Sequence, residues 1–123
     1  MEAPAYKQKQ TILIVDDSAM NRALLADMIG DEYEILEAEN GVQGIGQMQA
    51  LGTGISLVLL DIVMPEMDGF DVLAVMNKHG WIKDIPVIMV SSESASSYIE
   101  RAYELGVTDF ISRPFDANIV RRR

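Results

Sequence analysis

Three aspartates stand where two apolar runs of the sequence end, and their type and position suggest a metal site. Asp16 and Asp17 follow the run Ile12–Val15, and Asp61 follows the run Leu57–Leu60. A carboxylate at the end of a buried strand is costly unless its charge is used. Two strand ends that deliver three carboxylates to one pocket would suit a hard divalent cation.

The composition of the chain fits one acidic domain. Its 123 residues suffice for a single core, and 49% of them are apolar, which argues against disorder. A net charge of −9 argues against direct binding of nucleic acid. The absence of cysteine excludes disulfides and thiolate chemistry. No apolar stretch is long enough for a membrane span, and the polar residues 1–10 lack the apolar centre of a signal peptide. We therefore expect a soluble cytoplasmic protein.

Five short apolar runs alternate with helix-like segments. The runs are Thr11–Val15, Tyr33–Ala38, Leu57–Leu60, Pro86–Val90 and Asp109–Ile111. Three of them are almost continuously apolar, which is typical of strands covered on both faces, as in a parallel sheet. The pattern predicts an α/β fold with helices on both faces of the sheet. Ligands of such sheets bind beyond the carboxyl ends of the strands.

The segments between these runs predict helices. We expect the first from a cap at Ser18 to Ile29 with a stop at Gly30, the second over 41–51, and the third from a cap near Asp68. A fourth holds Ala95 to Leu105 and ends at Gly106, and a last one begins near Asp116. The apolar stripes of the first two helices are Met20, Leu24, Met28 with Leu25, Ile29, and Val42, Ile45, Met48, Leu51. Gly44 and Gly46 should weaken the second helix by about 1 kcal/mol each.

The end of the chain suggests how the domain is bounded. The last helix is short and runs into Arg121–Arg123, so we expect that the chain was cut from a longer protein. Residues 1–10 are interpreted as a polar extension and residues 11–123 as the domain.

Hydroxyl groups and a cation follow the fourth and fifth runs. Ser91 and Ser92 come after Val90, and Arg113 comes two residues after Ile111. Carboxylates for a metal, hydroxyl donors and a fixed cation are the parts that phosphoryl transfer needs, because charge on the transferred oxygens must be neutralised.

Taken together, these motifs resemble the receiver domain of two-component response regulators. The resemblance covers Thr11 to Arg123 and rests on four motifs in order: Asp16-Asp17, the stretch from Asp61 to Gly69, the strand ending at Ser91-Ser92, and the stretch from Phe110 to Phe115. It implies a flavodoxin-like (CheY-like) doubly wound five-stranded parallel sheet in the order 2-1-3-4-5.

The resemblance implies a role for each site residue. Asp61 would accept a phosphoryl group from a sensor histidine kinase, a phosphotransfer protein or a small acyl phosphate. Asp17 and Asp61 would bind Mg²⁺ (or Mn²⁺) together with the backbone carbonyl of Val63, and Asp16 would act mainly through a metal-bound water. Ser91 would bond the phosphoryl group after a shift, and Phe110 would report that shift by rotating inward.

The resemblance also sets expectations for the whole protein. The domain would be a signalling switch and not a turnover enzyme. It would bind neither nucleic acid nor membrane directly. An output domain would follow in the same parent chain. A homodimer is possible, but the oligomeric state stays open because the last helix, a frequent pairing surface in this family, is incomplete.

One residue departs from the family pattern and keeps a second interpretation open. Arg113 stands where lysine is usual, and the two are not interchangeable because arginine is longer, planar and bidentate. The chain could therefore be a degenerate receiver that acts as a phosphorylation-independent interaction module. A phosphohydrolase with an aspartyl nucleophile is disfavoured because Val63 lacks the acid/base group of such enzymes. His79, the single histidine, is interpreted as a solvated residue at a helix end.

Overall fold

The computed structural model describes residues 10–91 and 96–112, which form a five-stranded parallel sheet. The strands are β1 (Gln10–Val15), β2 (Tyr33–Ala38), β3 (Leu57–Asp61), β4 (Val87–Ser91) and β5 (Asp109–Ser112). Their order across the sheet is β2-β1-β3-β4-β5, and all four neighbouring pairs are parallel. Both the fold class and the strand order predicted from the sequence are confirmed.

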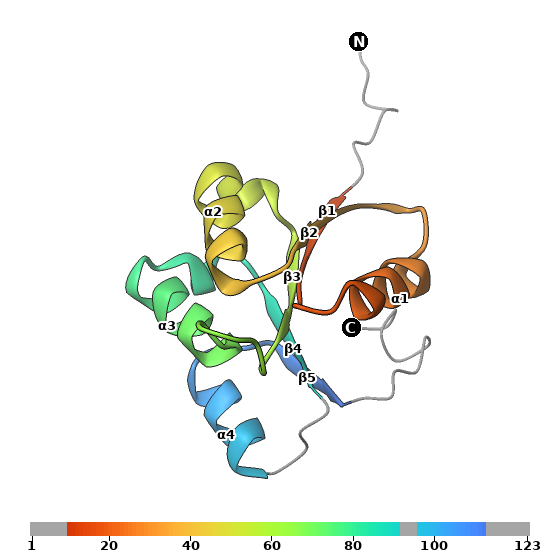
Figure 1. Ribbon diagram of the computed structural model, residues 1–123. Coiled ribbons are helices and arrows are strands. Elements are labelled where there is room, and N and C mark those ends of the chain that lie inside the picture. The colour runs from red at the N-terminus through yellow and green to blue at the C-terminus, as the bar shows by residue number, and fades with distance from the viewer. Residues whose placement is uncertain (1–9, 92–95, 113–123) are drawn as a thin grey trace.

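Helices cover both faces of the sheet. Figure 1 shows α1 (Ala19–Ile29) on one side and α2 (Gly41–Leu51), α3 (Gly69–Lys78) and α4 (Ser96–Glu104) on the other. Short 3₁₀ turns at Gly52–Gly54 and Trp81–Lys83 follow α2 and α3. This arrangement is the one that right-handed crossovers between parallel strands produce.

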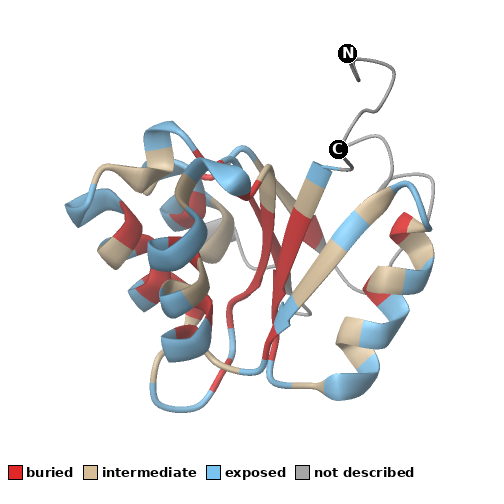
Figure 2. Cartoon of the chain, turned by 90° about the horizontal axis from the view of Figure 1, so that it is seen from above, coloured by how far each residue is buried: buried red, intermediate tan, exposed pale blue. Residues whose placement is uncertain are grey.

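The central strands are apolar because each face of the sheet is packed. Along β1, Leu13 and Val15 belong to the core on the side of α2, α3 and α4, while Ile12 and Ile14 belong to the core on the side of α1. Figure 2 shows buried residues concentrated along the inner strands. The edge strand β2 differs, since only Ala38 in it is buried. A nearly continuous apolar run is therefore a consequence of position inside the sheet.

The predicted helix caps are present. The Ser18 hydroxyl accepts a hydrogen bond from the Asn21 N–H at 3.2 Å, and Gly30 leaves α1 with φ of 87°. Asp68 begins α3 in a capping box with Asp71, in which each side chain accepts a hydrogen bond from the backbone N–H of the other. Gly106, with φ of 98°, follows the end of α4 as expected.

The predicted apolar stripe of α1 was partly wrong. Leu25 and Ile29 are buried, but Met20 is 79% exposed and Leu24 is 42% exposed. The two series of residues at four-residue spacing lie about 100° apart around the helix. The series of Leu25 and Ile29 faces the sheet, and of the other series only Met28 packs, partly buried, against the same core. The sequence pattern did not distinguish the two series.

The predicted stripe of α2 was also partly wrong. Val42 is 64% exposed and Leu51 is 45% exposed, whereas Met48 is fully buried. The rest of the buried face consists of Gly41 and Gly44. Gly44, one of the two glycines expected to weaken α2, therefore lets the helix backbone approach β1 closely, whereas Gly41 faces side chains of α3 and of the loop before it.

Some boundaries differ by one residue, and some predictions fall outside the described residues. The first strand begins at Gln10 and not at Thr11, and β4 runs over Val87–Ser91, one residue later than predicted. Residues 1–9 and the helix predicted from Asp116 lie outside the described part of the chain. Within that part, no helix is both long and apolar enough to cross a membrane.

Candidate functional site

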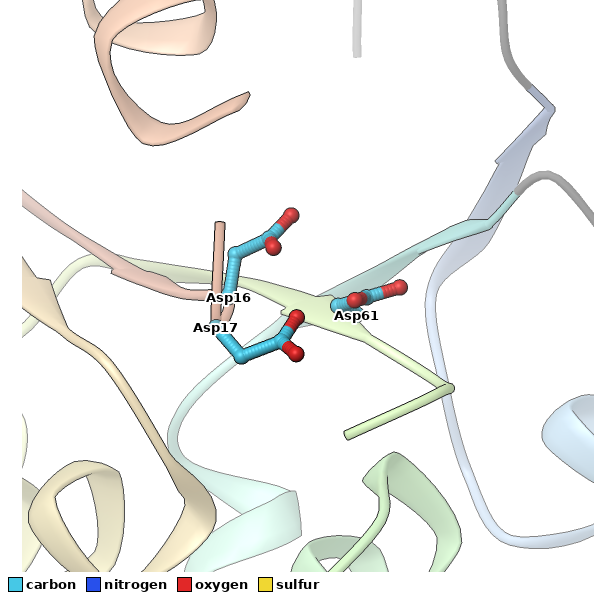
Figure 3. A group of neighbouring side chains, drawn as sticks. All are labelled: Asp16, Asp17 and Asp61. Atoms are coloured by element: carbon cyan, nitrogen blue, oxygen red, sulfur yellow. The ribbon is translucent and has the colours of Figure 1, made fainter. Parts of the chain in front are cut away.

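The three aspartates predicted from the sequence lie together at one edge of the sheet. Strands β1 and β3 are neighbours, with Val15 opposite Leu60, so the residues that follow these two positions are brought side by side. Asp16, Asp17 and Asp61 each offer a carboxylate oxygen, and these atoms lie within 4.8 Å of one another. Figure 3 shows the three side chains gathered at the ends of the two strands. The predicted convergence of the carboxylates is confirmed.

Burial differs sharply among the three carboxylates. Asp16 is 1% exposed and Asp61 is 4% exposed, and they are the buried charged residues of the described chain, while Asp17 is exposed. Neighbouring carboxylates repel one another when they are shielded from water. Three oxygen donors of this kind, one of them open to solvent, fit a hard divalent cation that keeps some of its water ligands.

The backbone around Asp16 is held by several hydrogen bonds. Its N–H donates to the Ala38 carbonyl at 3.0 Å, and its Oδ1 accepts from the Ser18 N–H at 2.9 Å. Its carbonyl oxygen accepts from Nη1 of Arg22 at 2.7 Å. The Nε of Arg22 in turn donates to Oε1 of Glu37 at 2.8 Å. Residues from β2 and α1 thus fix the segment that carries two of the three carboxylates.

Arg22 was missed by the reading of the sequence, although a signal was present. It stands three residues before Leu25 and seven before Ile29, the two buried residues of α1. This spacing puts a cation on the helix face that turns toward the sheet. A charged residue in an apolar stripe would have indicated a buried polar partner.

The loop after Asp61 is folded back against the end of β3. The Gly69 N–H donates to the Ile62 carbonyl at 2.7 Å, and a Cβ on Gly69 would collide with the backbone carbonyl of Asp61. Ile62 and Met64 are buried, whereas Val63 between them is 58% exposed. Only glycine at position 69 allows α3 to begin this close to the strand that carries Asp61.

The remaining predicted residues are placed in part. The backbone of Ser91 ends β4, directly after Val90, which is the register partner of Asp61. Phe110 lies on β5 and packs, partly buried, against the core on the side of α2, α3 and α4. Ser92 and Arg113 lie outside the described residues. His79 is exposed at the end of α3 and stacks on Trp81 with ring centroids 4.7 Å apart, as expected of a residue that takes no part in the site.

Comparison with known proteins decides the family. The sequence profile described as the response regulator receiver domain matches residues 12–123. The chain belongs to the response regulator receiver family. Among curated relatives of this receiver domain, it is 35% identical over 117 residues to histidine kinase P4 of Formosa agariphila and 30% identical over 112 residues to the two-component response regulator ORR3 of rice. The likeness covers 95% and 90% of the chain, respectively.

Solved structures agree with this assignment. The receiver domain matches a chain of the CheX–CheY–BeF₃–Mg²⁺ complex of Borrelia burgdorferi with a TM-score of 0.84 and 29% identity, over 92% of this chain and 84% of that one. The curated relatives differ greatly in how much of their own length the match covers. The matched region is 85% of the length of ORR3 but only 8% of the length of the histidine kinase.

Proposed function

We propose that this receiver domain is a phosphorylation-dependent switch that accepts a phosphoryl group on Asp61 from a partner histidine kinase or phosphotransfer protein. The observation that carries the proposal is the convergence of Asp61 with Asp16 and Asp17 at the carboxyl end of the sheet. Of the three, Asp61 is the one followed by the tightly folded loop to Gly69, which fixes its backbone. A rigid carboxylate beside two others is suited to nucleophilic attack on phosphorus once the local charge is neutralised.

The proposed reaction is a displacement at phosphorus. An Oδ atom of Asp61 forms the new P–O bond while the P–N bond of the donor phosphohistidine breaks. The bonding electron pair stays on the imidazole nitrogen, which leaves with it. The product is an acyl phosphate on Asp61, and with a small acyl phosphate as donor the leaving group is the carboxylate.

The three carboxylates and the backbone carbonyl of Val63 would hold Mg²⁺ (or Mn²⁺). Asp17 and Asp61 are proposed as direct ligands, and Asp16 is proposed to act mainly through a bound water. When bound, such a cation offsets the repulsion between a phosphoryl group and an acidic pocket. The similar structure from Borrelia burgdorferi is a complex of CheX and CheY with BeF₃ and Mg²⁺, and it supports this part of the proposal.

The proposed response to phosphorylation involves three residues beyond the carboxylates. The Ser91 hydroxyl would move to bond the new phosphate oxygens, Arg113 would pair with them, and Phe110 would turn inward behind β4. Support comes from the strand register, because Val90 lies opposite Asp61 and Met89 lies opposite Phe110. A local change of charge would thus bias a two-state element.

The wider setting is proposed from the relatives. The likeness to a small part of a histidine kinase, and to a quarter of a probable cyclic di-GMP phosphodiesterase of Vibrio cholerae, supports an output or kinase domain in the same parent chain. Catalytic turnover would then belong to such a domain and not to the receiver. A homodimer, the lack of direct nucleic acid and membrane binding, and a cytoplasmic location stay predictions from the sequence.

A degenerate receiver is the second candidate, and Arg113 favours it. An arginine in place of lysine could pair with the carboxylates without any phosphate. The domain would then serve as an interaction module whose shape does not respond to phosphorylation.

Labelling of Asp61 separates the two candidates. The wild-type domain is incubated with acetyl phosphate and Mg²⁺, and intact mass is measured beside Asp61→Asn and a sample with EDTA. The switch predicts a gain of one phosphoryl group that is lost in base and absent from both controls. Amide spectra with beryllofluoride and Mg²⁺ should change around Ser91 and Phe110. No phosphoryl adduct and no spectral change would leave the interaction module as the better explanation.

A further inference from the structure

Arg22 is a cation that lies on the sheet-facing side of α1. Its side chain is only 12% exposed, and it shares this face with the buried Leu25 and Ile29. A guanidinium in such a place loses hydrogen bonds to water, and hydrogen bonds to protein groups must replace them. Arg22 donates two such hydrogen bonds, and their acceptors indicate its role.

One guanidinium connects two separate elements to α1. Nη1 donates to the carbonyl oxygen of Asp16 at 2.7 Å, and Nε donates to Oε1 of Glu37 on β2 at 2.8 Å. Because the guanidinium is planar and rigid, fixing Nε on Glu37 also fixes the direction in which Nη1 points. Glu37, which is 47% exposed, therefore orients Arg22, and Arg22 orients the Asp16 carbonyl.

The Asp16 carbonyl is part of the peptide group that joins two of the site carboxylates. The peptide unit is planar, so a hydrogen bond to this oxygen also restrains the N and Cα atoms of Asp17. Asp17 is the exposed member of the trio, and the burial that fixes Asp16 and Asp61 does not restrain it. The contact from Arg22 reaches the backbone of this least constrained carboxylate.

We propose that Arg22, held by Glu37, is a positioning residue that sets the Asp16–Asp17 peptide for binding of a divalent cation. The inference rests on the proposed function, because it assumes that the three carboxylates take up Mg²⁺. Arg22 itself touches neither the cation nor the phosphoryl group. Groups that orient metal ligands typically change metal affinity by about 10- to 100-fold when they are removed.

The sign of the effect distinguishes positioning from simple electrostatics. Removing a positive charge close to an acidic pocket should tighten Mg²⁺ binding if charge alone matters. Removing a positioning group should weaken it. Arg22→Met keeps the aliphatic part of the side chain and deletes the guanidinium, so the two explanations predict opposite changes in Kd.

Calorimetric titration of the metal-free domain with MgCl₂ provides the test. We expect Arg22→Met to raise Kd by about 10-fold, at the lower end of the range for such groups. Arg22→Lys should recover part of the loss, because a lysine can reach only one of the two acceptors. Glu37→Gln should also weaken binding. Glu34→Gln removes the same charge from an exposed position of the same strand and should have a smaller effect.

Two further measurements keep the test specific. Titrations at low and high ionic strength separate screened charge effects from a change in geometry. Amide spectra of the metal-free proteins should show shifts at Asp17 and Ser18 in Arg22→Met and in Glu37→Gln, but not in Glu34→Gln. Circular dichroism reports whether each variant is folded, and if Arg22→Met is not, Glu37→Gln against Glu34→Gln carries the comparison.

The possible results are distinguishable. Unchanged or tighter binding by Arg22→Met, or equal effects of Glu37→Gln and Glu34→Gln, would overturn the positioning role while leaving the proposed function intact. Failure of the wild-type domain to bind Mg²⁺ at all would instead overturn the metal site on which both proposals depend.

Discussion

At the scale of single residues, Asp61 combines a structural cost with a chemical use. It is 4% exposed and lies beside two other carboxylates. In the absence of a cation, repulsion among them destabilises the folded state. The same arrangement creates the affinity for a cation. Stability and binding are therefore expected to change in opposite directions when one charge is removed.

Replacing Asp61 by asparagine should stabilise the metal-free domain by about 1 kcal/mol, because one buried like charge disappears. In excess Mg²⁺ the order should reverse. The wild-type domain gains about 2.7 kcal/mol when free Mg²⁺ is about 100 times its Kd, and the variant gains much less. Urea unfolding in EDTA and in Mg²⁺ checks both parts. A wild-type domain whose unfolding midpoint does not respond to Mg²⁺ would contradict the prediction.

Glu66 shows local backbone strain close to the site. Its φ is 70°, and among the described residues other than glycine it alone has a positive φ. We expect Glu66→Gly to stabilise the domain by about 0.5–1 kcal/mol, because the left-handed conformation costs a residue with Cβ about 1–2 kcal/mol and glycine gives part of the gain back as entropy. Glu66→Ala should be nearly neutral and Glu66→Val destabilising. Thermal unfolding of the three variants tests this order, and equal stabilities would show that the strain is absent.

The residues of the candidate site could be predicted from the sequence only where charged residues follow apolar runs at the ends of predicted strands. Asp16, Asp17 and Asp61 each follow an apolar run, which sufficed to predict their convergence. The role of Arg22 was not predictable in the same way, because it depends on hydrogen bonds to Asp16 and Glu37, which lie outside α1. A cation within the apolar stripe of α1 indicates a polar partner, but it does not indicate which residues of the other elements provide it.

At the scale of elements, α2 shows why the strength of a helix and its packing cannot be judged separately. A Cβ on Gly44 would lie 2.9 Å from Cγ2 of Val15, whereas a Cβ on Gly46 would meet no atom within 4 Å. Both glycines appear equally unfavourable in a sequence. Only Gly44 faces β1, the strand that ends just before Asp16.

The two glycines therefore predict opposite results for the same substitution. Gly46→Ala should stabilise the domain by up to about 1 kcal/mol through helix propensity alone. Gly44→Ala should lose more than it gains, because Val15 is fully buried and β-branched and cannot move aside, and such overpacking costs about 1–3 kcal/mol. Urea unfolding measures both variants. A stabilising Gly44→Ala would mean that α2 does not approach β1 as closely as the structure shows.

The pattern of strands and helices followed from the sequence, but the faces of the helices did not. Caps such as Ser18 and Asp68 are local and were predicted correctly. The buried face of α1 depends on how the whole helix is rotated against the sheet, which neither Met20 nor Leu24 reveals. Rotation is a tertiary property, and apolar residues on two adjacent sides of a helix leave it undetermined.

At the scale of the molecule, the sheet has a firm centre and a weaker margin. Strand β3 pairs with β1 on one side and β4 on the other, whereas β2, among the described strands, pairs only with β1. Strand β2 also carries the exposed Glu34 and Glu37 and buries only Ala38. This order of strands came from family resemblance, since the alternation of strands and helices is compatible with several orders.

Hydrogen exchange should reveal this gradient. Amides of Val58–Asp61 in β3 are expected to exchange only when the whole domain unfolds, because two partner strands and both cores protect them. Amides of β2 should exchange through a smaller opening that costs less free energy. In Arg22→Met the opening of β2 should become easier, since the bond to Glu37 that ties this strand to α1 is lost. Exchange measured by mass spectrometry under native conditions gives these free energies segment by segment. Equal protection of β2 and β3 would mean that the domain opens only as one unit, and that the margin of the sheet carries no separate stability.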